Sequence, residues 1–175
     1  MPIVPDTKNW TWVLERRCPE CGFEAYAFPR ETVGALIREN GAQWQAVLAR
    51  PDVARRPSDD MWSPLEYGCH VRDVYRVCLG RLELMLCEDD PDFPNWDQDA
   101  TAEEDRYLEQ DPVRVAAEVV EAAQRYADAY DAVSGELWSR PGTRSDGSRF
   151  TVESLARYSI HDPVHHLVDV GALAG

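Results

Sequence analysis

Apolar residues recur at helical spacing in four separate segments of the chain. The first segment spans about 31–50 and carries apolar side chains at Val33, Leu36, Ile37, Trp44, Val47 and Leu48. Pro29 precedes the segment and Pro51 follows it, and prolines at these places are typical of the limits of a helix. The pattern therefore predicts one amphipathic helix between the two prolines.

The second segment has the clearest beginning in the chain. Ser63 is a candidate N-cap, Pro64 suits the first helical position, and Glu66 completes a Ser-x-x-Glu capping box. The stripe that follows contains Tyr67, His70, Val71, Val74, Val77, Cys78, Leu82 and Met85. His70 lies two turns into this helix on its apolar stripe, where an imidazole without a partner would be costly.

The third and fourth segments also begin with capping residues. Asp111-Pro112 offers an N-cap and a first-turn proline, and the apolar steps of four and three that lead to Val133 suit bundle packing. Thr151 is a candidate cap for the last helix, which is expected to run nearly to Gly175. Pro163 lies inside that helix, so we expect a bend near residue 159.

The remaining segments are connections and an arm. Residues 88–110 are acidic and contain prolines; a connection of this length often covers a site, and a solvated crossover loop is the alternative. Residues 134–149 are turn-forming throughout. We therefore expect an all-α fold, a four-helix bundle over 30–175 that follows an irregular N-terminal arm over 1–29.

Composition and charge exclude several classes of function. The formal net charge of −14 argues against nucleic-acid binding, because contacts to phosphates need clustered lysine and arginine. No apolar run is long enough to span a membrane, and the N-terminus lacks the pattern of a signal peptide. The five cysteines are odd in number and show no disulfide spacing, which favours a reducing compartment. We expect a cytoplasmic protein without a membrane partner.

The histidines indicate a metal site. His161 and His165 are four residues apart, so on a helix they project from one face about one turn from each other. His70 would complete a three-histidine site that holds one divalent metal and leaves one position open. The alternative is that these are partly exposed histidines at helix ends. We expect Zn²⁺ first, with Ni²⁺, Mn²⁺ and Fe²⁺ open because nitrogen ligands alone do not discriminate among them.

Asp162 and His166 are candidate catalytic residues beside these ligands. An imidazole that binds a metal usually donates its other N–H to a carboxylate or a carbonyl, so Asp162 could orient a ligand or relay a proton. His166 points about 100° away from His165 around the helix, so we expect it to contact the substrate or the ligands rather than be a fourth ligand. A solvated helix face is the alternative for Asp162.

These residues resemble a known family. Trp62 before a capped helix, His70 eight residues later and the pair His161-x-x-x-His165 are similar to the DinB-like metal-dependent superfamily, over roughly 30–172. The resemblance implies a four-helix bundle in up-down-down-up order, with one long connection between the second and third helices. It also implies that His70, His161 and His165 are the three metal ligands.

The N-terminal segment and the composition resemble an actinobacterial subgroup of that superfamily. The segment is residues 8–23, and Lys8 is the only lysine in an arginine-rich chain. Related members are thiol-dependent transferases and isomerases, so the resemblance implies a metal-dependent thiol S-transferase that uses a low-molecular-weight thiol, with mycothiol favoured. The metal would hold the thiol as a thiolate that attacks an electrophile. The expected partners are this small-molecule thiol and an electrophile, and the sequence leaves a homodimer open.

Two other functions stay open. The segment His161-Asp162-x-x-His165 is similar to the His-Glu-x-x-His motif of zinc peptidases, which would make the protein a metal hydrolase that activates water. The shorter aspartate and the proline inside the motif argue against this, because base catalysis depends on geometry. The third function is a non-catalytic stress or binding module, in which metal binding adds to the free energy of folding.

Cys18-Pro-Glu-Cys21-Gly resembles one half of a zinc ribbon, whose knuckle presents two thiolates to a metal. The chain contains no second Cys-x-x-Cys, so a four-cysteine site cannot form. A tight turn that packs the arm is the first interpretation, and the next is a second metal site, which would use distant ligands, or an arm-anchoring site. A redox pair ranks last, because no βαβ pattern accompanies the motif.

Overall fold

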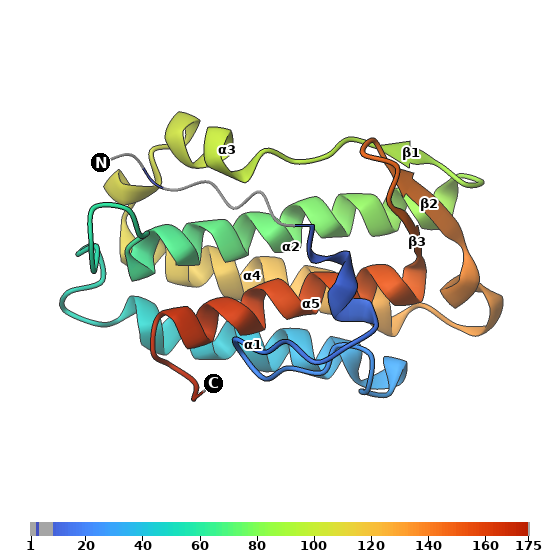
Figure 1. Ribbon diagram of the computed structural model, residues 1–175, viewed down its shortest axis with the longest axis horizontal. Coiled ribbons are helices and arrows are strands. Elements are labelled where there is room, and N and C mark those ends of the chain that lie inside the picture. Colours follow the sequence, from blue (N-terminus) through green and yellow to red (C-terminus); the bar gives the residue numbers. More distant parts are fainter. Residues whose placement is uncertain (1–2, 4–8, 175) are drawn as a thin grey trace.

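Four long helices form a bundle in the computed structural model, which describes residue 3 and residues 9–174. They are α1 (Val33–Leu48), α2 (Pro64–Cys87), α4 (Pro112–Asp131) and α5 (Val152–Asp169). Helices α1 and α5 run in one direction and α2 and α4 in the other, and both α4 and α5 pack between α1 and α2 (Figure 1). The expected all-α bundle and its up-down-down-up order are confirmed.

The predicted caps form as expected. Ser63 and Glu66 make a complete capping box, and the side chains of Asp111 and Thr151 each accept a backbone N–H at the start of their helices. The last helix ends at Asp169, earlier than predicted. Gly171 has a positive φ of 64°, and the chain closes in a Schellman motif that satisfies the last carbonyls.

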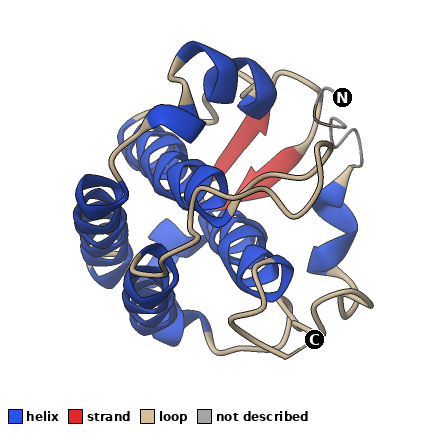
Figure 2. Cartoon of the chain, turned by 90° about the vertical axis from the view of Figure 1, so that its left-hand side faces the viewer, coloured by secondary structure: helices blue, strands red, loops and turns tan. Residues whose placement is uncertain are grey.

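A small sheet, which the sequence did not predict, adds to the bundle. Strand β1 (Asp92–Phe93) pairs in parallel with β2 (Pro141–Arg144), and β2 pairs antiparallel with β3 (Arg149–Thr151) (Figure 2). The segment 134–149 was therefore wrongly expected to be turns throughout. Strands this short show no readable alternation of polar and apolar residues, and the partner of β2 lies far away in the sequence.

The connection between α2 and α4 is long because these two helices run in the same direction, so the chain must return along the bundle. It contains β1, helix α3 (Gln98–Glu104) and a 3₁₀ turn at Tyr107–Glu109. The connection is structured, and it covers the histidine of α2, because Trp96 stacks on His70 with ring centroids 5.4 Å apart. This agrees with the prediction that the connection covers a site.

A buried ion pair anchors this connection to α2. The Tyr107 hydroxyl donates to Asp73 at 2.7 Å, and the Arg72 guanidinium donates to both Asp73 carboxylate oxygens at 2.9 and 2.8 Å. Burial raises the pKa of Asp73, but Arg72 and Tyr107 outweigh it, and the pKa lies below its ordinary value. Asp73 is thus held ionised in the folded protein.

The described part of the N-terminal arm packs along α5. It contains a 3₁₀ turn at Trp10–Leu14 that contacts α5, and Val13 is buried in that contact. The guanidinium of Arg157 on α5 donates to the carbonyls of Ala25 and Phe28 at 3.0 and 2.9 Å. The division of the chain into an arm and a bundle stays a prediction. Within the described residues, none of the helices combines the length and the apolar character needed to cross a membrane.

Gly41 allows α1 and α4 to approach closely, since a Cβ at this position would lie only 2.6 Å from the Cβ of Ala123. Gly41→Ala should therefore lower the free energy of unfolding by about 1–3 kcal/mol through overpacking. A Cβ at Gly80, on α2, would meet no described atom within 4 Å. The matched control Gly80→Ala should raise the free energy of unfolding by about 0.5–1 kcal/mol. Urea unfolding measures both, and equal effects would contradict the close packing.

Asp73→Asn keeps the shape of the side chain and removes its charge. It should lower the free energy of unfolding by about 1.5–3 kcal/mol near neutral pH, because hydrogen bonds to a charged group are lost. The folded-state pKa lies below the unfolded-state value, so this stabilisation is present above about pH 4 and is lost as the pH falls through the folded pKa. Urea unfolding at neutral and acid pH should show the difference between wild type and variant shrinking, and a constant difference would contradict it.

Candidate functional site

Helix α5 carries four side chains of types that bind metals in one short stretch: His161, Asp162, His165 and His166. His161 and His165 are one pair four residues apart, and Asp162 and His166 are another. The two pairs are offset by one residue, which turns the helix by about 100°, so they lie on neighbouring faces. The first pair meets the N-terminal arm, and the second meets α2.

His70, Asp162 and His166 form what we call the α2–α5 cluster. Each residue offers one ligand atom, and these atoms lie within 4.8 Å of one another. Nε2 of His70 lies 3.1 Å from Oδ1 of Asp162, and Nε2 of His166 lies 3.5 Å from the same oxygen. Two imidazoles and one carboxylate therefore converge from two helices.

Aromatic rings hold the two imidazoles of this cluster. His70 is fully buried and lies against Trp62 and Trp96, with ring centroids 5.3 and 5.4 Å away. The ring of His166 contacts Tyr67 at 4.7 Å between centroids. Residues before α2, on α2 and in the connection thus fix where these rings lie.

Charge is also organised around the α2–α5 cluster. Burial raises the pKa of Asp162, but His70 and His166 outweigh it, so the pKa of this carboxyl lies well below its ordinary value. Nδ1 of His166 lies 2.7 Å from Oδ2 of Asp169, and it must donate because a carboxylate only accepts. A carboxylate that fixes the far nitrogen of an imidazole is typical of metal-binding histidines.

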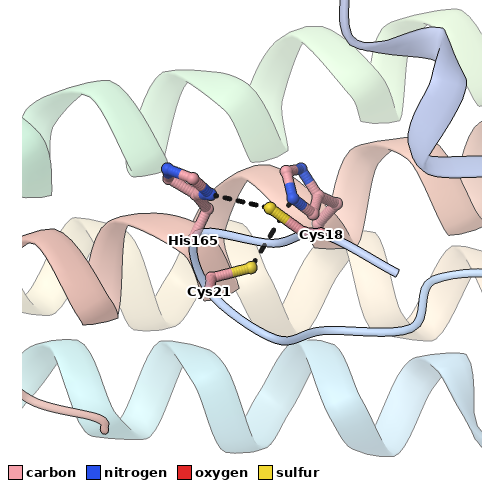
Figure 3. A group of neighbouring side chains, drawn as sticks. Cys18, Cys21 and His165 are labelled. Atoms are coloured by element: carbon pink, nitrogen blue, oxygen red, sulfur yellow. Dashed lines mark hydrogen bonds between the residues drawn. The ribbon is translucent and has the colours of Figure 1, made fainter. Parts of the chain in front are cut away.

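Cys18, Cys21, His161 and His165 form a second group, which we call the arm cluster. Their ligand atoms also lie within 4.8 Å of one another, and all four residues are buried. Sγ of Cys18 lies 3.7 Å from Nδ1 of His165, and Sγ of Cys21 lies 3.6 Å from Nε2 of His161. Figure 3 shows both cysteines on the arm beside α5, with the Cys18 sulfur directed at His165. Burial and the neighbouring His165 lower the pKa of His161 to about 4.

The structure thus divides the predicted ligands His70, His161 and His165 between two clusters. His70 meets Asp162 and His166, the two residues expected to be catalytic, whereas His161 and His165 meet the two arm cysteines. The reason is the rotation of α5, which turns its 162/166 face toward α2 and its 161/165 face toward the arm. Which residues bind a metal, and which are catalytic, stays a prediction.

The sequence left open a mixed metal site for the two cysteines, but it did not identify His161 and His165 as their partners, although a signal was present. Cys-x-x-Cys and His-x-x-x-His together supply the ligands of a Cys₂His₂ site. The two halves lie at opposite ends of the chain, so only the packing of the arm on α5 brings them together.

A cavity of about 610 Å³ lies beside both clusters. Asp162 and His166 line it, as do His161 and His165 of the arm cluster and the arm residues Trp10 and Glu20. Its other acidic lining residues are Asp60, Asp97, Asp99, Asp146 and Asp169. Its other aromatic lining residues are Trp62, Tyr67, Trp96 and Tyr158, and Arg144 is its one basic residue among the described part of the chain. Arg144 is paired with Asp146 at 2.7 Å, so the cavity is acidic and aromatic.

The residues of the α2–α5 cluster fit a divalent cation. Imidazole nitrogens and a carboxylate oxygen are ordinary ligands of Zn²⁺ and of the related transition metals. Nδ1 of His70 is buried and has no hydrogen-bond partner among the described residues. Nε2, which lies 3.1 Å from Oδ1 of Asp162, is the nitrogen that a cation in this cluster would bind.

Comparison with known proteins agrees with the fold. The model of the DinB superfamily matches residues 48–169, which is more than half of the chain. A solved structure of YfiT from Bacillus subtilis, described as a probable metal-dependent hydrolase with an unusual four-helix bundle topology, superposes with a TM-score of 0.72. The two chains are 19% identical, and the match covers 82% of this chain and 86% of YfiT. At this identity the likeness shows the fold alone. No curated protein matches the sequence.

His70→Ala removes the buried imidazole that α2 contributes to the α2–α5 cluster. We expect the variant to lose the metal that this cluster holds, measured by elemental analysis after gel filtration. Asp169→Asn leaves the three ligands in place but alters the contact to His166, and it should weaken the metal affinity by about 10–100-fold in a chelator competition. Glu83→Gln, on the exposed part of α2, is the control and should change neither. Full metal content in His70→Ala would contradict the assignment of this ligand.

Proposed function

The chain belongs to the DinB superfamily, and on this basis we propose that it is a divalent-metal-dependent thiol S-transferase that uses a low-molecular-weight thiol, with mycothiol favoured. The observation that supports the proposal is the α2–α5 cluster, whose Asp162 and His166 line an acidic, aromatic cavity. Zn²⁺ is the first choice of metal.

His70, Asp162 and His166 would hold the cation in this proposal. A divalent cation bound there would keep the sulfur of a thiol ionised, because one ligand carboxylate leaves a net positive charge at the site. Asp162 is already ionised in the fold, and Asp169 fixes the ring of His166. The chain therefore prepares the ligands before either substrate binds, so little reorganisation accompanies binding.

The cavity lining supports a thiol that carries hydroxyl groups and no carboxylate. Its acidic side chains accept hydrogen bonds from hydroxyl groups, and its aromatic rings offer apolar surface. The cysteine of mycothiol is carried on an uncharged sugar and inositol, which meets these groups without repulsion. Glutathione carries two carboxylates, and the one basic residue that lines the described cavity, Arg144, is already paired with Asp146.

The reaction is a nucleophilic displacement. The thiol sulfur forms a bond to an electrophilic carbon, a leaving group departs with its electron pair, and the thiol proton passes to solvent. Trp62 and Trp96 flank His70 and keep water away from that side of the cluster. Exclusion of water favours attack by the thiolate, because hydrogen bonds from water lower the reactivity of a charged nucleophile.

A metal-dependent hydrolase is the second candidate. It is favoured by the fold neighbour YfiT, which is described as a probable metal-dependent hydrolase. In that case water takes the place of the thiol in the same cavity. The two candidates share the α2–α5 cluster, and they differ in whether product forms without a thiol.

The test is a matrix of thiols and electrophiles with zinc-loaded protein. We expect a chromogenic aryl halide to be consumed only when a thiol is present, with mycothiol giving a higher kcat/KM than glutathione. His70→Ala should lower kcat/KM by at least about 100-fold, since it removes a buried ligand, and Glu83→Gln should not change it.

The same matrix includes a nitrophenyl ester without thiol. Rapid ester hydrolysis that is lost in His70→Ala would favour the hydrolase over the transferase. Metal binding with no turnover in either assay would contradict both reactions and leave the site a structural one.

A further inference from the structure

The arm cluster combines four side chains of types that bind metals, and all four are buried. Cys18 is 0% exposed, Cys21 7%, His161 3% and His165 8%. The two cysteines come from the N-terminal arm and the two histidines from α5. Cys18 and His165 are 147 residues apart in the sequence, and Cys21 and His161 are 140 residues apart. Two sulfurs and two nitrogens within 4.8 Å of one another match the ligands of a tetrahedral Cys₂His₂ site.

The backbone around the two cysteines has the form of a metal-binding knuckle. The N–H of Gly22 donates to the carbonyl of Cys18 at 2.9 Å, and the N–H of Cys18 donates to the carbonyl of Phe23 at 3.0 Å. Gly22 has a φ of 73°, which a residue with a side chain rarely adopts, so the tight turn depends on this glycine. The turn brings both thiols to one side of the loop, toward α5 (Figure 3).

The histidine side of the cluster is also prepared for a metal. Nε2 of His165 lies 3.5 Å from a carboxylate oxygen of Glu20 and 3.8 Å from one of Asp169. The other ring nitrogen, Nδ1, faces the sulfur of Cys18. Carboxylates thus lie behind the His165 imidazole as Asp169 lies behind that of His166, although the contact to His166 is shorter, at 2.7 Å. The ring of Trp10 covers both histidines, with centroids 5.3 and 5.2 Å away.

We propose that Cys18, Cys21, His161 and His165 bind a structural Zn²⁺, separate from the metal of the α2–α5 cluster. Thiolate and imidazole ligands together select zinc over the harder divalent cations. Four protein ligands leave no open position, so this ion is structural and not catalytic. It joins the N-terminal arm to the helix that also carries Asp162 and His166.

The proposed zinc would help to position one wall of the cavity. Asn9, Trp10 and Glu20 belong to the arm and line the cavity, and the two cysteines attach that arm to α5. His161 and His165 alternate along α5 with Asp162 and His166, so an ion on one face limits the rotation of the other face. Loss of this zinc should therefore loosen one wall of the cavity and the ligands of the neighbouring cluster.

Metal counting tests the proposal directly. Full-length protein loaded with Zn²⁺ should contain two equivalents by elemental analysis, and Cys18→Ser/Cys21→Ser should contain one. Cys87→Ser replaces an exposed cysteine at the end of α2 and is the matched control, which should keep two. His70→Ala should also contain one, but the one that remains must be held by sulfur.

Cobalt identifies which site remains. Wild type and His70→Ala loaded with Co²⁺ should both show an intense near-ultraviolet sulfur-to-cobalt charge-transfer band, and Cys18→Ser/Cys21→Ser should lack it. This measurement on wild type and His70→Ala keeps the test valid if the cysteine variant fails to fold. A wild-type cobalt spectrum without the band, or zinc content unchanged in the cysteine variant, would overturn the proposal.

The outcome is independent of the proposed activity. One sulfur-bound equivalent in wild type, with none lost in His70→Ala, would support the arm site and contradict the metal of the α2–α5 cluster. Two equivalents and the cobalt band without any transferase turnover would contradict the activity and support the arm site.

Discussion

The chemistry of this protein depends on the spacing of four side chains along α5. His161 and His165 form one pair and Asp162 and His166 another, each four residues apart and offset from the other by one. An α-helix turns by about 100° per residue, so a single rigid element offers ligand atoms on two neighbouring faces. One face meets the arm cysteines and the other meets His70 of α2. Neither face could shift without moving the other.

The order of the helices determines what surrounds these ligands. Because α2 and α4 run in the same direction, the chain must return along the bundle between them, and this return covers His70 with Trp96. Tyr107, held by the ionised Asp73, fixes the same connection to α2. The topology of the bundle and the burial of His70 therefore have one cause.

The two clusters differ in the property that separates catalytic from structural metal sites. The α2–α5 cluster supplies three ligands, of which Asp162 and His166 line the cavity, so a bound cation would keep a position for a substrate. The arm cluster supplies four buried ligands, and no position would be free. The Asp169 carboxylate contacts one imidazole of each cluster: it lies 2.7 Å from Nδ1 of His166 and 3.8 Å from Nε2 of His165. In the proposed arrangement, one ion positions the arm and α5, and the other carries the thiol.

The sequence by itself determined the four helices, their caps, the long covering connection and the residue types that could bind a metal. These follow from local rules, because capping residues, prolines and apolar periodicity act within a few turns of chain. The grouping of the ligands was decided by tertiary structure. His70 could pair with either face of α5, and the rotation of that helix depends on packing against α1, α2 and the arm together. For the same reason the contact between Cys18 and His165, and the pairing of β1 with β2, could not be read from the sequence, since each joins segments that only the folded bundle brings together.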